Sequence, residues 1–431
     1  MTIRPLIGLA TLLLGAACGS QRETGDTLGA AARDYVILSL TIGEKEEGYI
    51  DAYYGPPELQ AKAKAEAPKL ALPELVKRTD ALAARVSALE SEGPDARRAA
   101  FLTAQLTAAK TRLRMMMGET LSFADEAKGL FGVTPELKPL ASYDAVLARI
   151  ETLVPGPGPL STRVDAFQDR FTIPAAKLKP VFDAAIAECK ARTARHIALP
   201  KGERFDMAFV TGKSWSGYNY YLGNATSRIE INTDLPIRIG RAVDLGCHEG
   251  YPGHHVLNAL LEQRLVLDKG WIEFSVYPLY SPQSLIAEGS ANYGIDLAFP
   301  GPERLAYETR ILYPLAGLST ADAGRYAGLQ DAMKALAGAR FTIAREYLEG
   351  RIDEADAVRL VQRYQLVSPE RAKQSIAFTK QYRSYVINYG MGQDMVRADI
   401  ERAGASPQAR WKRMEQLLSE PTLPSDLRGG S

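Results

Sequence analysis

Residues 247–255 constrain this chain of 431 residues most, because three of its four histidines fall within them. On one straight helix, His248 and His254 would lie about 9 Å apart along the axis and roughly 240° apart around it, too far to share a metal ion. However, Pro252 lacks the N–H that a helix needs and its ring clashes with the preceding turn, while Gly253 can adopt backbone angles that other residues avoid. We therefore expect the helix to break or bulge at Pro252.

The residue types in this stretch indicate metal chemistry. A histidine followed by a glutamate and a further histidine is typical of zinc hydrolases, in which imidazoles hold the metal and the glutamate acts as general base. The usual spacing of the two histidines is four residues, whereas His248 and His254 are six apart. We interpret Pro252 and Gly253 as a two-residue insertion that returns His254 to the level of His248. His255 would then be a partner of a ligand or an alternate ligand.

Apolar residues recur at helical spacing over most of the chain, for example at Leu75, Leu82 and Val86. Residues 228–233 alternate as a strand does, whereas the aromatic residues 215–221 before them are typical of a loop. These patterns predict a mainly α fold with a small β-sheet or hairpin beside the metal cleft. The strand would either offer its edge to an extended peptide or only support the metal-binding helix.

The two ends of the chain differ in composition from the body. Residues 1–17 have the basic start, short apolar run and small residues of an export signal peptide, and Cys18 is a candidate for lipidation. A plain secretory signal is the alternative, and the apolar run is shorter than the roughly 20 residues that span a bilayer. We expect an exported protein of the bacterial cell envelope, a lipoprotein facing the periplasm and anchored through Cys18. Residues 18–30 would form a flexible tether and residues 421–431 a flexible tail.

The body of the chain is divided here into an N-terminal helical region, residues 31–200, and a metal-binding catalytic region, residues 201–420. Lys and Arg number 52 against 51 Asp and Glu, and this net charge of +1 does not favour nucleic acid as a partner. Besides Cys18 the chain has Cys189 and Cys247. Two cysteines do not suggest a disulfide framework, and we expect Cys247 to be a buried thiol.

Two polar residues lie one helical turn from the candidate metal ligands. Asp244 precedes His248 by four residues and would either orient its ring or be an ordinary acid on the helix surface. Asn292 follows Glu288 by four residues, so it would be placed to orient a ligand.

The segments 248–255 and 288–293 resemble a bacterial zincin-like family catalogued as a domain of unknown function, whose signature is His-Glu-x-x-Pro-Gly-His. The resemblance extends to residues 53–57, 215–219 and 231–236, and so covers most of the chain. It implies membership of the zinc metallopeptidase superfamily in which a glutamate is the third ligand. It also implies a helical zincin-like metallopeptidase fold around a deep cleft.

Carried onto this chain, the resemblance implies that His248, His254 and Glu288 bind Zn²⁺ and that Glu249 takes the proton of a metal-activated water. Ligands of this kind suit zinc best but also accept other divalent ions. The expected activity is that of an exported zinc-dependent hydrolase, a metallopeptidase acting on peptides or peptide-like substrates. Endopeptidase and carboxypeptidase action both stay open. So do two other classes, a non-catalytic cell-envelope binding protein that retains the zincin site and a metal-dependent hydrolase of a non-peptide ester or amide.

Attack on a peptide carbonyl creates an oxyanion, which requires a hydrogen-bond donor besides the metal. The segment 381–392 is rich in phenols, and Tyr385, Tyr389 and Arg383 within it are our candidates. A phenol or a guanidinium near the site could also bind a substrate carboxylate.

Overall fold

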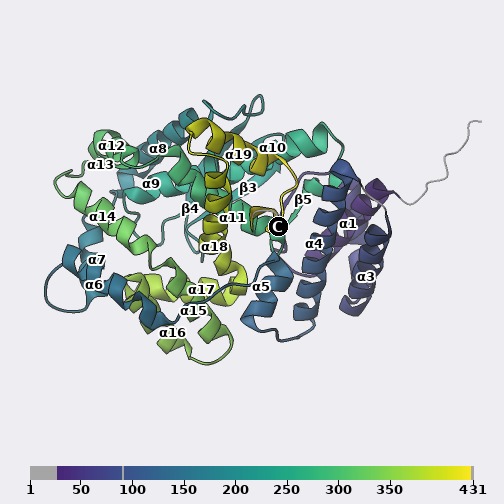
Figure 1. Cartoon of the computed structure of the whole chain (residues 1–431), viewed down its shortest axis with the longest axis horizontal. Helices are drawn as coiled ribbons and strands as arrows, with labels where there is room; N and C mark the ends of the chain where they lie inside the picture. Colours follow the sequence, from purple (N-terminus) through teal and green to yellow (C-terminus); the bar gives the residue numbers. More distant parts are fainter. Residues whose placement is uncertain (1–26, 90–91, 429–431) are drawn as a thin grey trace, which may run out of the picture.

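Helices dominate the computed structural model of the chain, which describes residues 27–89 and 92–428 (Figure 1). The strands form only two small sheets, and the predicted mainly α fold class is confirmed. The predicted signal peptide, the Cys18 lipidation site and most of the predicted tether lie outside the described residues. Within these residues, no helix combines the length and the apolar character that crossing a bilayer requires.

The helices run through the described chain in the following order. They are α1 (Leu28–Gly43), α2 (Pro57–Glu66), α3 (Leu72–Ala88), α4 (Gly93–Met116), α5 (Phe123–Phe131), α6 (Asp144–Leu153), α7 (Leu160–Asp169), α8 (Leu178–Thr193), α9 (Gly240–Leu245), α10 (His254–Leu261), α11 (Pro282–Ala298), α12 (Glu303–Tyr307), α13 (Tyr313–Ala316), α14 (Ala323–Lys334), α15 (Ala337–Leu348), α16 (Glu354–Gln365), α17 (Pro369–Tyr382), α18 (Ile387–Arg402) and α19 (Pro407–Ser419).

Helix ends and buried faces follow from local sequence. The side chain of Ser122 accepts a hydrogen bond from the Asp125 N–H and so begins α5, and Gly132, with a φ of 72°, caps its C-terminal end. In α3, Leu75, Leu82 and Val86 are all buried, as their spacing predicts. The N-terminal helices α1, α3 and α4 stand together at one end of the molecule (Figure 1).

The strands are β1 (Ile50–Tyr53), β2 (Arg204–Val210), β3 (Gly217–Gly223), β4 (Thr226–Asn232) and β5 (Val276–Pro278). The predicted strand corresponds to β4, which lies at the centre of the sheet β2-β4-β3, parallel to β2 and antiparallel to β3. The prediction of a loop over residues 215–221 was wrong for most of its length. Tyr218, Tyr220 and Tyr221 lie on β3, and Tyr221 faces the core while Tyr220 and Leu222 do not, which is the period of a strand.

Contacts join the two regions on either side of the predicted boundary at residue 200. Strand β1 pairs with β5, and the buried Arg98 guanidinium bonds both carboxylate oxygens of the buried Glu273, with Nε to Oε1 at 2.6 Å. The body also begins and ends further out than expected, since α1 starts at Leu28 and Leu427 is buried. The Arg402 guanidinium donates to the Leu427 carbonyl at 2.7 Å, so residues 426–428, which we predicted to belong to a flexible tail, are packed against α18.

Helices α11 and α18 pack along each other through the middle of the molecule (Figure 1). Their backbones touch at Gly289 and Gly392, where a Cβ on Gly289 would lie 2.5 Å from the backbone carbonyl of Gly392. No side chain fits between two helices at this distance. The glycines therefore bring the helix that carries Glu288 directly against the helix that carries Tyr389.

Candidate metal site

The metal-binding stretch is not a regular helix. After α9 the chain forms a π turn over Gly246–Gly250, leaves helical geometry at Tyr251, and begins α10 at His254. The Gly253 N–H donates to the Cys247 carbonyl at 3.1 Å, and a Cβ on Gly253 would lie only 1.7 Å from the His248 carbonyl oxygen. The predicted bulge is confirmed, and only glycine can occupy its closing position.

The bulge brings His248 and His254 together. Their Nε2 atoms lie 3.1 Å apart, and the Glu288 carboxylate approaches both, at 3.2 Å from His248 and 3.8 Å from His254. The three ligand atoms lie within 4.8 Å of one another, and the described residues contain no other group of this kind. The three residues that the resemblance implied as ligands thus meet at one point.

This donor set fits a tetrahedral zinc ion. Two ligands at about 2.0–2.1 Å from zinc in tetrahedral geometry lie roughly 3.3 Å apart, close to the observed nitrogen separation. Glu288 Oε2 is buried, and within the described chain its only polar contact is the ion pair with His248 Nε2 at 3.2 Å. Two imidazole nitrogens face each other here beside a buried carboxylate oxygen. A cation between them would bind their lone pairs and balance the negative charge.

The protonation states favour metal binding as well. Burial is the main reason that the pKa of His254 falls to about 4, so this imidazole is neutral at pH 7. Burial acts to raise the pKa of Glu288, but His248 and His254 together with the Tyr385 phenol hold it below its ordinary value, so Glu288 is ionised. Burial acts to lower the pKa of His248, but Glu288 and Glu249 raise it overall. The two carboxylates thus favour a positive charge at this group of donors.

His255 points away from this group. It is fully buried, with Nδ1 at 2.8 Å from the Ser227 hydroxyl and Nε2 at 2.9 Å from the Glu203 carboxylate. Lys190 also pairs with Glu203 at 2.5 Å, and Tyr251 donates to it at 2.5 Å. Both ring nitrogens of His255 are therefore occupied in a closed polar cluster, so His255 is neither an alternate ligand nor a partner of one.

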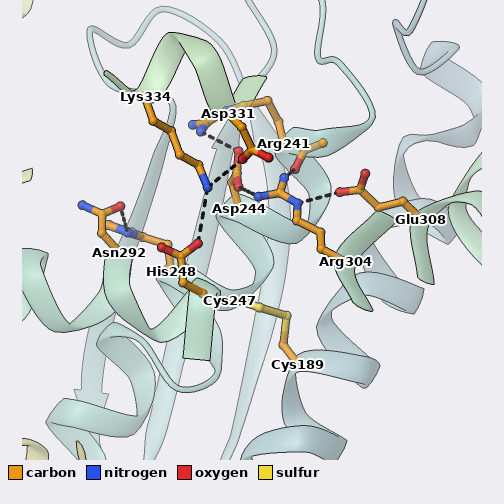
Figure 2. A network of polar contacts seen from close by, with 12 residues as sticks. Cys189, Arg241, Asp244, Cys247, His248, Asn292, Arg304, Glu308, Asp331 and Lys334 are labelled. Carbon is orange, nitrogen blue, oxygen red and sulfur yellow. Dashed lines mark hydrogen bonds and ion pairs between the residues drawn. A yellow bond between two sulfur atoms is a disulfide. The ribbon is translucent and has the colours of Figure 1, made fainter. Parts of the chain in front are cut away.

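Asn292 holds the His248 ring, as its spacing predicted. The Asn292 amide donates to the Tyr389 carbonyl at 3.0 Å, and this contact leaves its Oδ1 to accept from His248 Nδ1 at 3.2 Å (Figure 2). With the proton on Nδ1, the lone pair of Nε2 faces the other ligands. Asp244 does not orient His248. Its carboxylate turns to Arg304 at 2.8 Å and Arg241 at 3.4 Å, because two guanidiniums are stronger partners than a neutral imidazole (Figure 2).

Glu249 is buried beside the ligands and lines a cavity of about 1750 Å³ that also contains His248, His254 and Glu288. Burial raises the pKa of Glu249 to about 7. A carboxyl group with this pKa can both accept and return a proton near neutral pH. Gly217 on β3 makes room for it, since a Cβ there would lie 2.8 Å from Glu249 Oε1.

The three residues proposed as oxyanion donors have different surroundings. The Tyr385 phenol donates to Glu288 Oε1 at 2.8 Å and so supports a ligand. Tyr389 lines the cavity, and its ring stacks on His248 with centroids 6.3 Å apart. Burial raises the pKa of Tyr389 well above its usual range, which keeps the phenol protonated as a donor. Arg383 is not at the site, because its guanidinium pairs with the buried carboxylate of Glu126 at 2.8 Å.

Sequence reasoning missed several charged residues of the cavity, among them Asp51 and Arg340. Asp51 lies on β1 and accepts a hydrogen bond from the Tyr218 phenol, and burial raises its pKa to about 7. Its neighbours at residues 53–57 belong to the motifs that carry the family resemblance, and that was the available signal. Arg340 lies on α15, and no local sequence pattern distinguishes it.

The expectation of a buried Cys247 thiol was wrong. Cys247 forms a disulfide with Cys189 of α8, with Cα atoms 5.5 Å apart (Figure 2). The two cysteines are 58 residues apart in sequence. Only the packing of α8 against the π turn brings them together, so their spacing gave no signal. The bond attaches the residue preceding His248 covalently to a long helix.

The fold is similar to that of a protein from Colwellia psychrerythraea described as a "putative lipoprotein", with a TM-score of 0.51 and 15% sequence identity over 86% of this chain and 72% of that one. At this identity the likeness shows the fold alone. An M32 carboxypeptidase from Deinococcus radiodurans R1 aligns over 91% of this chain and 89% of its own, with a TM-score of 0.36 and 14% identity. No protein-family model and no curated protein matches the chain, so the resemblance to the zincin-like family rests on the motifs themselves.

Proposed function

We propose that this protein is a zinc-dependent hydrolase that cleaves peptide bonds. The observation that carries the proposal is the meeting of His248 Nε2, His254 Nε2 and the Glu288 carboxylate within 4.8 Å, in the same cavity as Glu249. A non-catalytic binding protein has no need of a buried carboxyl group with a pKa of about 7 beside such a group of donors.

Zinc held by these residues would supply Lewis acidity toward water and a carbonyl oxygen. Glu249 accepts the proton of the attacking water as the new C–O bond forms. The Tyr389 phenol donates a hydrogen bond to the oxyanion. Glu249 then returns the proton to the amide nitrogen as the C–N bond breaks, and the products are a carboxylate and an amine.

The disulfide supports the proposal that the protein acts outside the cytoplasm. Disulfides persist in oxidising compartments such as the bacterial periplasm. The link between Cys189 and Cys247 is therefore in agreement with the export signal predicted for residues 1–17 and with an envelope location.

The test is to measure zinc content and peptide-library hydrolysis for the full chain and its Glu249→Gln variant. We expect one zinc per chain in both proteins, and cleavage that falls about 10²- to 10⁴-fold in the variant. A chelator should abolish the activity of the wild type and added zinc should restore it. A chain that binds zinc but cleaves no peptide would support the binding-protein alternative, and cleavage of esters alone would support the non-peptide hydrolase.

A further inference from the structure

Arg340 on α15 is a cation without an anion. Among residues 27–89 and 92–428, no carboxylate forms an ion pair with its guanidinium and no group accepts a hydrogen bond from its buried Nε. By contrast, Arg345 on the same helix pairs with Glu346 at 2.6 Å. The arginine fork usually meets a carboxylate or phosphate when it is withdrawn from water, because an unpaired buried charge is costly.

Two aromatic rings hold this guanidinium at the cavity wall. Its Cζ lies 5.2 Å from the centre of the Phe378 ring and 5.9 Å from that of Tyr389. Tyr389 in turn stacks on His248. Arg340 is thus linked to a candidate metal ligand through a single aromatic side chain. Cation–π contacts fix the position of a guanidinium but leave its N–H donors free for a ligand.

A second arginine of the cavity provides a comparison. Arg371 on α17 also forms no ion pair within the described residues, but its Nη2 donates to the Pro236 carbonyl at 2.6 Å. Part of its fork is therefore already used by the protein. Arg340 has no such contact, so it offers the more complete set of donors.

The chemistry of a peptide substrate identifies the missing anion. A peptide that lacks acidic side chains still carries one carboxylate, at its C-terminus. An extended chain advances about 3.3–3.6 Å per residue, so a carboxylate one to three residues beyond the scissile bond lies within about 11 Å of it. We propose that Arg340 binds the C-terminal carboxylate of the substrate, so that the enzyme removes one or a few residues from the C-terminus. This inference rests on the proposed peptidase function and names its substrate class.

The experiment compares matched peptides that end in a free carboxylate or in a carboxamide, together with a third set that has a glutamate side chain near an amidated end. It uses the wild type and the variants Arg340→Met, Arg340→Lys, Arg371→Met and Arg345→Met. We expect the wild type to cleave the free acids with a kcat/KM about 10- to 100-fold above that of the amides. Arg340→Met should lose this preference mainly through KM, Arg340→Lys should regain part of it, and Arg345→Met should keep it.

Several outcomes would overturn the inference while leaving the peptidase intact. They are equal cleavage of acids and amides by the wild type, loss of the preference in Arg371→Met but not in Arg340→Met, and a preference for the glutamate side chain alone. If the wild type cleaves nothing, the proposed function fails instead. Calorimetric binding of the acid and amide peptides to Glu249→Gln then decides the role of Arg340. Thermal unfolding and zinc content show whether each variant is folded, and Arg340→Lys serves if Arg340→Met is not.

Discussion

Two adjacent histidines, His254 and His255, show how differently one turn of helix can use the same side chain. His254 faces a cavity, where its Nε2 meets that of His248 at 3.1 Å and the buried Glu288 Oε2 contacts only His248. His255 faces the core, where both of its ring nitrogens have protein partners. The first group is incomplete without a ligand and the second is complete. This difference, rather than the residue types, distinguishes a binding site from a structural polar cluster.

The strongest test of this comparison exchanges the two histidines for alanine one at a time. His254→Ala should lose its zinc, because two ligands remain. His255→Ala should keep the zinc but lose about 1–3 kcal/mol of stability, since the Ser227 hydroxyl and the Glu203 carboxylate lose a buried partner. Zinc content by mass spectrometry and thermal unfolding check both expectations. Loss of zinc from His255→Ala alone would reverse the comparison.

The second test concerns helix α8, which carries Cys189 and Lys190 and contacts both the group around His254 and the cluster around His255. The disulfide from Cys189 closes a loop across a separation of 58 residues, while Lys190 pairs with Glu203 in the His255 cluster. Replacing both cysteines by alanine should lower the free energy of unfolding by about 2–4 kcal/mol. Denaturant unfolding of the double variant beside the wild type, with and without reductant, measures this loss. An unchanged midpoint would show that the disulfide does not contribute to stability.

The third test changes the orientation of the His248 ring in the candidate metal site. Asn292→Ala removes the acceptor for His248 Nδ1, so the ring can rotate and change tautomer. Zinc affinity should fall about 10- to 100-fold, with little change in melting temperature of the metal-free protein. Competition with a fluorescent zinc chelator measures the affinity. Asp244→Asn is the matched control, because Asp244 pairs with arginines rather than with His248, and it should leave the zinc affinity unchanged.

The last test concerns the pH dependence of stability that Asp51, at the cavity wall, should produce. Burial raises the pKa of Asp51 to about 7, above its unfolded value. The folded protein therefore binds the proton more tightly, and stability from this group is full below about pH 4 and falls as the pH rises to about 7. The slope is at most about 1.4 kcal/mol per pH unit. Unfolding of metal-free wild type and Asp51→Asn across this range should show the slope only in the wild type, and parallel curves would disprove it.

The sequence was sufficient to predict the bulge, because Pro252 and Gly253 exclude a straight helix whatever the rest of the chain does. The motifs shared with the zincin-like family also singled out the two histidines and the carboxylate, whose ligand atoms the structure brings within 4.8 Å of one another. It failed wherever partners come from distant segments. Arg383 was expected at the site, but the buried Glu126 carboxylate binds it, and no local pattern reveals such a pairing.

The same limit applies to the strands and the disulfide. The aromatic run at residues 215–221 has the appearance of a loop, yet β3 forms because β4 offers it an antiparallel partner. Strand pairing and disulfides join separate segments, whereas the backbone hydrogen bonds of a helix form between residues four apart in one segment. A mainly helical chain is therefore predicted well in outline, while its cavity wall, which combines β1, β3, α11, α15 and α18, is predicted least well.

The contact between Gly289 and Gly392 has a consequence for redesign. Because backbone meets backbone there, the spacing between the two helices is set by the main chain and not by the size of any side chain in the cavity. The contact therefore fixes the distance between the helix that carries Glu288 and the helix that carries Tyr389. Side chains elsewhere along the cavity wall can then be exchanged to admit new substrates without changing the spacing of the two helices that carry the reacting groups. Substitution of either glycine would instead push the two helices apart and change the distances across the whole site.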